Sequence, residues 1–260
     1  MALSEKDKKG VMLIVGVVAV LLAIVATKLA LGTPPKGGPD GCFGKVAANT
    51  VIVLDHSETV SEQTRTEIVA RAMAHVRDKT QTNERVTVFN VSELSKKSLV
   101  PAFSRCKPSH EGNRAYEDTR GIEKAFKRDF IEPLQAVLGT APSNSKESPI
   151  AQALIDISLT QYMRGEQNSL LVFSDLLEYT PKFSLYSCGD AKKAVTLFRE
   201  SRKGAQERPR FRHTSVYLNM IPRMEISKAT LKCRDQVWEW FFGDNEGAGA
   251  HSDIAYLPGA

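Results

Sequence analysis

An apolar run of the sequence ends abruptly in a carboxylate and two hydroxyls. Residues 51–54 (Val-Ile-Val-Leu) are followed by Asp55, Ser57 and Thr59 at alternate positions. This spacing brings three hard oxygen donors to one side of a short loop, a set that suits Mg²⁺ or a similar cation better than Zn²⁺. The same stretch also fits a strand end followed by a helix cap, because Thr59 and Glu62 match a capping box. Metal binding and helix capping are both open on these residues alone.

The hydrophobic pattern indicates how this loop is positioned. Four consecutive β-favouring apolar residues at 51–54 predict a buried parallel strand, and open α/β sheets place their sites at the carboxyl ends of such strands. A second run, Ser169 followed by the apolar residues 170–173, ends in the same way with Ser174 and Asp175. Both carboxylates therefore mark predicted strand ends.

Further strands and helices follow from the same pattern. Pro133 should kink or split the helix predicted at about 122–138. The strands at 85–91 and 98–103 are separated by too few residues for a crossover helix, so we expect an antiparallel hairpin with its second strand at a sheet edge. Another strand is predicted at 214–220, and helices at about 60–78, 122–138, 148–157, 189–202 and 227–242.

Three motifs together resemble the metal-ion-dependent adhesion site of von Willebrand factor A-type domains. They are Asp55-x-Ser57-x-Thr59 after a strand, Ser148-Pro149-Ile150-x-x-Ala153-Leu154 opening a helix, and Asp175 at the end of a later strand. The match covers residues 45–242 in element order. It implies an α/β fold with a doubly wound, mostly parallel six-stranded sheet and one antiparallel edge strand.

The resemblance also implies a site and an activity. A divalent cation, Mg²⁺ or alternatively Mn²⁺ or Ca²⁺, would be bound by Asp55, Ser57, Thr59, Ser148 and Asp175. Thr59 and Ser148 depart from the usual hydroxyl residues of the motif but keep its oxygen chemistry. In such domains a carboxylate of a protein partner often completes the cation's shell, so the expected output is regulated adhesion or assembly, without catalysis or a small-molecule substrate.

Two alternatives compete with this interpretation. Asp55-x-Ser57-x-Thr59-Val60 also looks like the motif of haloacid-dehalogenase-like phosphatases, with Asp55 as nucleophile. Ser57 then occupies the position of a second Asp and cannot protonate a leaving group near neutral pH, and Asp244 and Asp253 only thinly imitate that family's later acidic pair. The other alternative is a structural domain whose metal site has decayed.

The first 44 residues differ in composition from the rest. Residues 11–31 are apolar apart from Thr27 and Lys28 and are long enough to cross a bilayer. A cleaved signal peptide is the competing interpretation, although no clear Ala-x-Ala site follows. Lys6, Lys8 and Lys9 precede the segment and only Lys36 closely follows it, which predicts a cytoplasmic N-terminus.

The predicted organisation is therefore a single-pass membrane protein with an extracytoplasmic domain, periplasmic in a Gram-negative cell. Residues 1–10 form a cytoplasmic tail, 11–31 the transmembrane helix, 32–44 a Pro/Gly tether, 45–242 the domain and 243–260 a flexible tail. The net charge of +5 is modest. No nucleic-acid-binding motif accompanies it, so we expect no nucleic-acid partner.

Four cysteines, Cys42, Cys106, Cys188 and Cys233, should oxidise outside the cytoplasm, and four allow three pairings. Strands running as in the resembled fold would place Cys42 and Cys106 at the sheet end opposite the metal and the other two nearer to it. The resemblance thus favours Cys42 with Cys106 and Cys188 with Cys233, since bonded cysteines need Cα atoms within about 7 Å.

A basic cluster follows the helix after Asp175. We expect it at the tether end of the domain, where it faces anionic headgroups or is an ordinary solvated loop. Its members are Arg199, Arg202, Lys203, Arg208, Arg210 and Arg212.

Overall fold

The chain forms two compact units, Met1–Lys36 and Gly37–Ala260. The structure, a computed structural model, describes residues 5–30, 38–57, 59–91, 99–110, 112, 118–142, 145–243 and 251–258. The predicted tether is described only from residue 38 onward, so most of it lies outside the described residues.

The first unit contains one helix, α1, which runs over Glu5–Ala30. Its segment Lys9–Thr27 has a mean hydropathy of 2.9, and its described side chains are exposed within this unit. The helix is long and apolar enough to cross a membrane. This agrees with the apolar segment predicted over residues 11–31.

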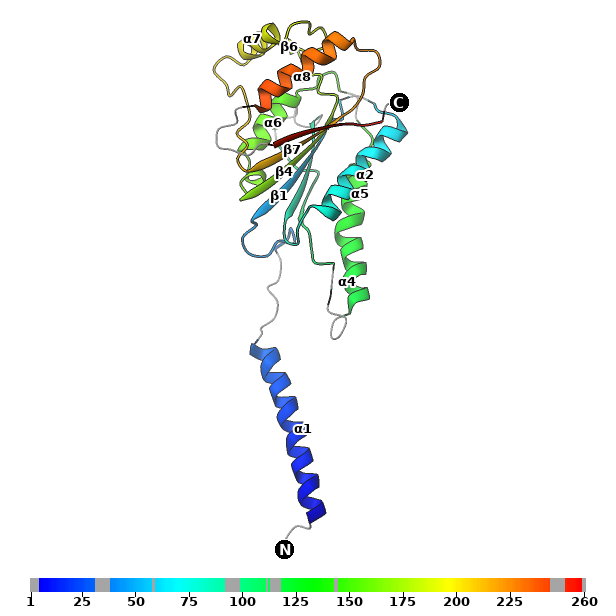
Figure 1. Ribbon diagram of the computed structural model, residues 1–260, viewed down its shortest axis with the longest axis vertical. Helices are drawn as coiled ribbons and strands as arrows, with labels where there is room; N and C mark the ends of the chain where they lie inside the picture. Colours follow the sequence, from blue (N-terminus) through cyan, green and yellow to red (C-terminus); the bar gives the residue numbers. More distant parts are fainter. Residues whose placement is uncertain are drawn as a thin grey trace. The chain divides into compact units, whose positions relative to one another are not determined.

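The second unit is built on a six-stranded sheet in the spatial order β3-β2-β1-β4-β7-β8 (Figure 1). Five strands are parallel to their neighbours, and β3 pairs antiparallel with β2 at one edge. The predicted α/β class, with a mostly parallel sheet and one antiparallel edge strand, is confirmed. The strands are β1 Ala48–Leu54, β2 Arg85–Asn90, β3 Phe103–Cys106, β4 Gln167–Ser174, β7 Thr214–Met220 and β8 His251–Tyr256.

Helices cover both faces of this sheet (Figure 1). One face packs against α2 (Glu62–Asp78) and α5 (Glu132–Leu138), and the other packs against α6 (Ile150–Leu159), α7 (Ala191–Ser201) and α8 (Lys228–Phe242). Central strands buried on both faces explain why β1 and β4 are continuous apolar runs in the sequence. Short elements complete the fold: the 3₁₀ helix η2 (Gln161–Met163) and the hairpin of β5 (Tyr179–Thr180) and β6 (Phe183–Ser184).

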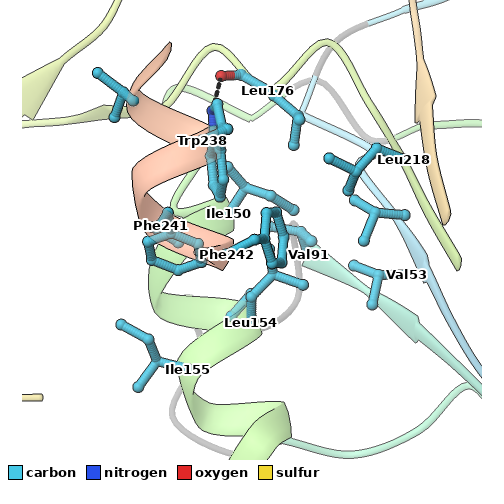
Figure 2. Packing of buried hydrophobic residues seen from close by; sticks show 14 of the residues in the cluster. Val53, Val91, Ile150, Leu154, Ile155, Leu176, Leu218, Trp238, Phe241 and Phe242 are labelled. Atoms are coloured by element: carbon cyan, nitrogen blue, oxygen red, sulfur yellow. Dashed lines mark hydrogen bonds between the residues drawn. The ribbon is translucent and has the colours of Figure 1, made fainter. Parts of the chain in front are cut away.

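Aromatic side chains of α8 pack in one buried cluster with residues of α6 and of the sheet (Figure 2). Trp238 packs against Phe241 with ring centroids 4.8 Å apart. Its indole N–H donates a 2.7 Å hydrogen bond to the carbonyl of Leu176. Because Leu176 directly follows Asp175, this core contact also fixes the segment that presents one of the predicted site residues.

The helix predicted over residues 122–138 is divided. It consists of α4 (Thr119–Phe126), a π-helical turn η1 (Lys127–Ile131) and α5. Pro133 lies in the first turn of α5, where its missing N–H costs least, and the wider turn immediately before it accommodates the ring. The predicted break at Pro133 is confirmed.

One alternative and two predicted boundaries are wrong. Helix α2 is capped by Ser61, whose hydroxyl accepts the N–H of Thr64, so Thr59 is not its cap. Strand β3 begins at Phe103, five residues later than predicted, because Pro101 precedes the paired stretch. Residues 251–256, predicted as part of a flexible tail, form β8, which pairs with the otherwise open edge of β7.

Two disulfides close the domain, Cys42–Cys106 and Cys188–Cys233, with Cα atoms 4.9 Å and 5.8 Å apart. This is the pairing that the resemblance favours. The first bond fixes the end of the tether to β3. An ion pair of 2.7 Å between Asp40 and Arg85 also fixes it to β2.

Candidate functional site

The two predicted carboxylates lie at the carboxyl ends of adjacent strands. Strand β1 pairs with β4 so that Leu54 lies opposite Phe173; Asp55 directly follows Leu54, and Asp175 follows Ser174, the last residue of β4. The strand order reverses between β1 and β4, because the chain builds outward to β2 on one side and to β7 on the other. A position where the order reverses is the usual ligand site of a doubly wound sheet.

Asp55 is buried, and three donors satisfy its carboxylate. Oδ1 accepts the backbone N–H of Ser57 at 3.0 Å. Oδ2 accepts the hydroxyls of Ser174 at 2.6 Å and Ser148 at 3.1 Å. All three donors are uncharged, so they orient Asp55 without neutralising it.

Ser148 reaches Asp55 because the segment after Asp175 clamps it. Its backbone N–H and C=O pair with the C=O and N–H of Tyr179, at 2.8 Å and 3.1 Å. The helix that Ser148 precedes, α6, has no side-chain cap of its own. Instead, the buried carboxyl group of Glu178 accepts the N–H of Ala151 at 2.8 Å and so caps the helix from a distant part of the chain.

Asp175 is also buried, but the guanidinium of Arg223 neutralises its carboxylate. Its Oδ2 accepts the Nε–H of Arg223 at 2.7 Å, and its Oδ1 accepts the backbone N–H of Leu177 at 2.9 Å. Its carbonyl accepts a guanidinium N–H of Arg234 at 2.8 Å. Leu176 has a φ of 56°, a conformation that non-glycine residues rarely adopt and that marks a tightly constrained segment.

Burial shifts the acidity of this segment. Desolvation, and next the charge of Asp55, raise the pKa of Asp175 against the opposing effects of Leu177 and Arg223. Burial likewise raises the pKa of Glu178 to about 8. The negative charge of Asp55 thus opposes the ionisation of Asp175, and Arg223 offsets this effect only in part.

The hydroxyl residues differ in position. Ser57 and Ser148 are buried and line a cavity of about 300 Å³ together with Lys146, Tyr179 and Tyr186. Thr59, in contrast, is exposed, and the structure records no hydrogen bond between its side chain and the described residues. The structure thus brings together four of the five predicted ligands, and Thr59 lies outside this group.

The donor set fits a hard divalent cation. Two carboxylates and the hydroxyls of Ser57 and Ser148 supply oxygens only, which suits Mg²⁺ or Mn²⁺ and not Zn²⁺. Among the described residues no group of three or more His, Cys, Asp or Glu side chains is placed to bind a metal, so the hydroxyls are needed to complete any site. One carboxylate oxygen of the set is already occupied by Arg223.

Arg223 and Glu178 were not predicted from the sequence. Arg223 follows the end of β7 by three residues, and the rule that assigned Asp55 and Asp175 to strand ends also applies to that loop. A single arginine in a loop nevertheless carries no spacing that would distinguish it. Glu178 lies three residues after Asp175 and gives no sign in the sequence that it is buried.

The predicted basic cluster is partly engaged in internal contacts. Arg199 pairs with Glu207, Arg202 donates to Gln152, and Arg208 donates to the carbonyl of Trp240 and lies over its ring. Lys203, Arg210 and Arg212 are exposed. The carbonyl of Arg212 accepts the side chain of Asn168 near the start of β4, so this part of the cluster lies at the predicted end of the sheet. Contact with a membrane stays a prediction.

Comparisons with known proteins gave weak results. No protein-family model matches the chain, and no curated protein matches its sequence. Among solved structures, the human COPII-coat protein Sec24c matches with 12% identity and a TM-score of 0.33, over 84% of this chain and 30% of that one. An aerotolerance-related membrane protein from Bacteroides fragilis matches with 14% identity and a TM-score of 0.36, over 80% and 89%. The fold assignment therefore rests on the strand order of this chain.

Proposed function

We propose that this chain is a membrane-anchored module that binds a protein partner through a divalent cation held by Asp55, Ser57, Ser148 and Asp175. The observation that carries the proposal is the convergence of these residues, from three distant parts of the sequence, at the point where the strand order reverses. When bound, the cation supplies positive charge and open coordination positions for an oxygen ligand. Asp55, Ser57, Ser148 and Asp175 would hold the cation at the carboxyl edge of the sheet.

The surroundings of the site support a protein partner. Tyr179 is 46% exposed and lines the cavity next to Ser57 and Ser148. Met224, in the loop after β7 at the same edge of the sheet, is 83% exposed. Exposed aromatic and methionine side chains are enriched where proteins bind each other. A partner carboxylate on the cation, flanked by apolar contacts to Tyr179 and Met224, fits this arrangement.

We propose a binding module in preference to a phosphatase. In the competing interpretation Asp55 is a nucleophile and the residue at position 57 is its acid. Here position 57 is a serine, and both oxygens of Asp55 accept hydrogen bonds from fixed donors. Of the two later acidic residues, Asp244 lies outside the described residues and Asp253 lies within strand β8.

Metal dependence is tested by stability and partner capture together. At an Mg²⁺ concentration about 100 times the Kd, binding should add about 2.7 kcal/mol to the free energy of unfolding. The melting temperature should then rise by about 5 °C relative to chelator. Asp55→Asn should abolish this increment, while Asp156→Asn, a matched change on α6 away from the site, should preserve it.

The same samples identify the partner. Capture from membranes in Mg²⁺ and in chelator, compared by mass spectrometry, should enrich a protein only with Mg²⁺ and only with the wild-type site. Equal melting temperatures and equal capture in both conditions would instead favour the alternative of a decayed, metal-free site.

The anchor is tested by topology. Because three lysines precede the apolar segment and only Lys36 closely follows it, the domain should lie outside the cytoplasm. A periplasmic-type reporter fused after Ala260 should be active, and a reporter that works only in the cytoplasm should be silent. Moving the three N-terminal lysines to the other side of the segment should reverse both results. Cytoplasmic activity of the unaltered chain contradicts the proposed orientation.

A further inference from the structure

We infer that Arg223 is a built-in cation of the site, which neutralises Asp175 in the absence of metal and which a divalent cation must displace in order to bind. This inference rests on the proposed metal-dependent function and adds a regulating residue to it. Arg223 would then set the metal affinity of the site and keep it closed at low metal concentration.

The position of Arg223 is well defined by contacts around it. The loop that carries it leaves β7 next to β4, where the N–H of Ile221 donates to the carbonyl of Ser174 at 3.0 Å. The Nε–H then reaches Asp175 Oδ2 at 2.7 Å, with the Arg223 side chain only 14% exposed. The ion pair is thus largely buried, where charge-assisted hydrogen bonds are stronger than at the surface.

A second arginine nearby does not share this role. Arg234 is fully buried and contacts Asp175, but only through the backbone carbonyl. Its Nε–H donates to the carboxylate of Asp235 at 2.9 Å, so its charge is balanced there. Arg223 is therefore the cation that the described contacts assign to the Asp55 and Asp175 carboxylates.

The charges explain why exchange is possible. Among the described residues Asp55 receives only uncharged donors, so Arg223 leaves one of the two negative charges uncompensated there. A divalent cation compensates both, which favours replacement. Dehydration of Mg²⁺ opposes it, because Mg²⁺ sheds water reluctantly whereas a guanidinium is weakly hydrated. A guanidinium and a metal ion on the same carboxylate repel each other, so the two cations exclude one another.

The first test compares metal affinities by calorimetry, with the full chain in detergent micelles. Arg223→Gln should bind Mg²⁺ at least about tenfold more tightly than the wild type, because a buried charge-assisted contact no longer competes. Arg71→Gln is the matched control. Arg71 lies on α2 and contacts Glu67 and Asn219. The Arg71→Gln substitution therefore removes the same formal charge as Arg223→Gln without removing a contact to Asp175.

The outcomes separate this inference from the function on which it rests. The inference is supported if Arg223→Gln binds Mg²⁺ more tightly than the wild type and Arg71→Gln does not. It is equally supported if Arg223→Gln binds Mg²⁺ and the wild type shows no measurable binding. Equal affinity in the wild type and Arg223→Gln overturns the role of Arg223 and leaves the metal-dependent function standing. No binding by any of the three proteins overturns both.

The second test uses the wild-type chain and so does not depend on the folding of a variant. The Nε–H of Arg223 should give a protected NMR signal without metal, and Mg²⁺ should shift it and increase its exchange with water. The Nε–H of Arg234 is the internal control and should change little. An Arg223 signal that is unaffected while bound Mg²⁺ is detected calorimetrically overturns the inference.

Discussion

Replacing Glu178 with glutamine should make the domain more stable at about pH 8, by on the order of 3 kcal/mol, and should flatten the dependence of its stability on pH. Burial raises the pKa of the Glu178 carboxyl to about 8 from its ordinary value of 4.5. A glutamine keeps an oxygen that can accept the N–H of Ala151, the hydrogen bond that caps α6. The variant therefore removes the charge and keeps the cap.

The sign follows from proton binding. Below about pH 4.5 Glu178 is protonated in both the folded and the unfolded chain, and its contribution to stability is fully present. Between about 4.5 and 8 the folded chain retains a proton that the unfolded chain has lost. The free energy of unfolding therefore falls as the pH rises, by up to about 1.4 kcal/mol per pH unit, until the contribution is lost above the folded-state pKa.

Urea unfolding in chelator, from about pH 5 to about pH 8, measures this slope. Glu178→Gln should lose most of it, and a smaller slope should remain because the pKa of Asp175 is also raised. The exposed Glu132→Gln, a matched change on α5, should leave the wild-type slope intact. Parallel curves for the wild type and Glu178→Gln would show that the buried carboxyl is ionised in the folded state.

Loss of the Lys107 ammonium should destabilise the domain by about 3 kcal/mol. Lys107 is buried, and its Nζ donates to the carbonyls of Val76, Arg77 and Thr80 at 2.7–3.1 Å. These carbonyls end helix α2, where the peptide dipoles favour a cation. Without Lys107 they lose their donor, and the buried Glu84 loses a neighbouring positive charge.

Two substitutions divide this effect into its parts. Lys107→Met keeps the apolar stem and removes the ammonium. It should therefore lower the free energy of unfolding by nearly as much as Lys107→Ala does. Lys79→Ala, at the exposed C-cap of the same helix, should cost less than about 0.5 kcal/mol. Urea midpoints with both disulfides intact provide the comparison. Equal costs for Lys79→Ala and Lys107→Met would mean that the three carbonyls do not need the buried cation.

The parts of the fold that the sequence predicted are those that depend on local pattern. The runs at 51–54 and 170–173 are uniformly apolar because β1 and β4 are buried on both faces, and that pattern identified Asp55 and Asp175 as strand ends. Strand β8 escaped prediction because it lies at the sheet edge and its described side chains, at 253–256, are exposed, which leaves no clear apolar alternation. Its pairing depends on the open edge of β7, which is a tertiary feature.

In the candidate site, too, local pattern identifies some residues, and contacts across the fold place the others. Ser148 was recognised because it opens a helix, whereas the residues that hold it, Glu178 and Tyr179, act through contacts across the fold. Thr59 satisfies the spacing of the motif and yet is exposed. Spacing in a loop fixes which residues are near one another, and the direction of each side chain depends on the backbone conformation between them.

The Cys42–Cys106 disulfide also limits how far the domain can search for a partner. It fixes the chain to β3 from about Asp40 onward, so residues 31–37 are left to connect α1 with the domain, and they span at most about 25 Å when fully extended. With residues up to Ala47 released, the limit would be roughly 60 Å, and the volume within reach would increase more than tenfold. With α1 in a bilayer, as proposed, the short connecting segment raises the local concentration of the site for partners close to the same membrane surface. In a chain anchored as proposed, the Cys42–Cys106 bond and the Asp40–Arg85 ion pair would together set how far from the membrane the domain can bind a partner.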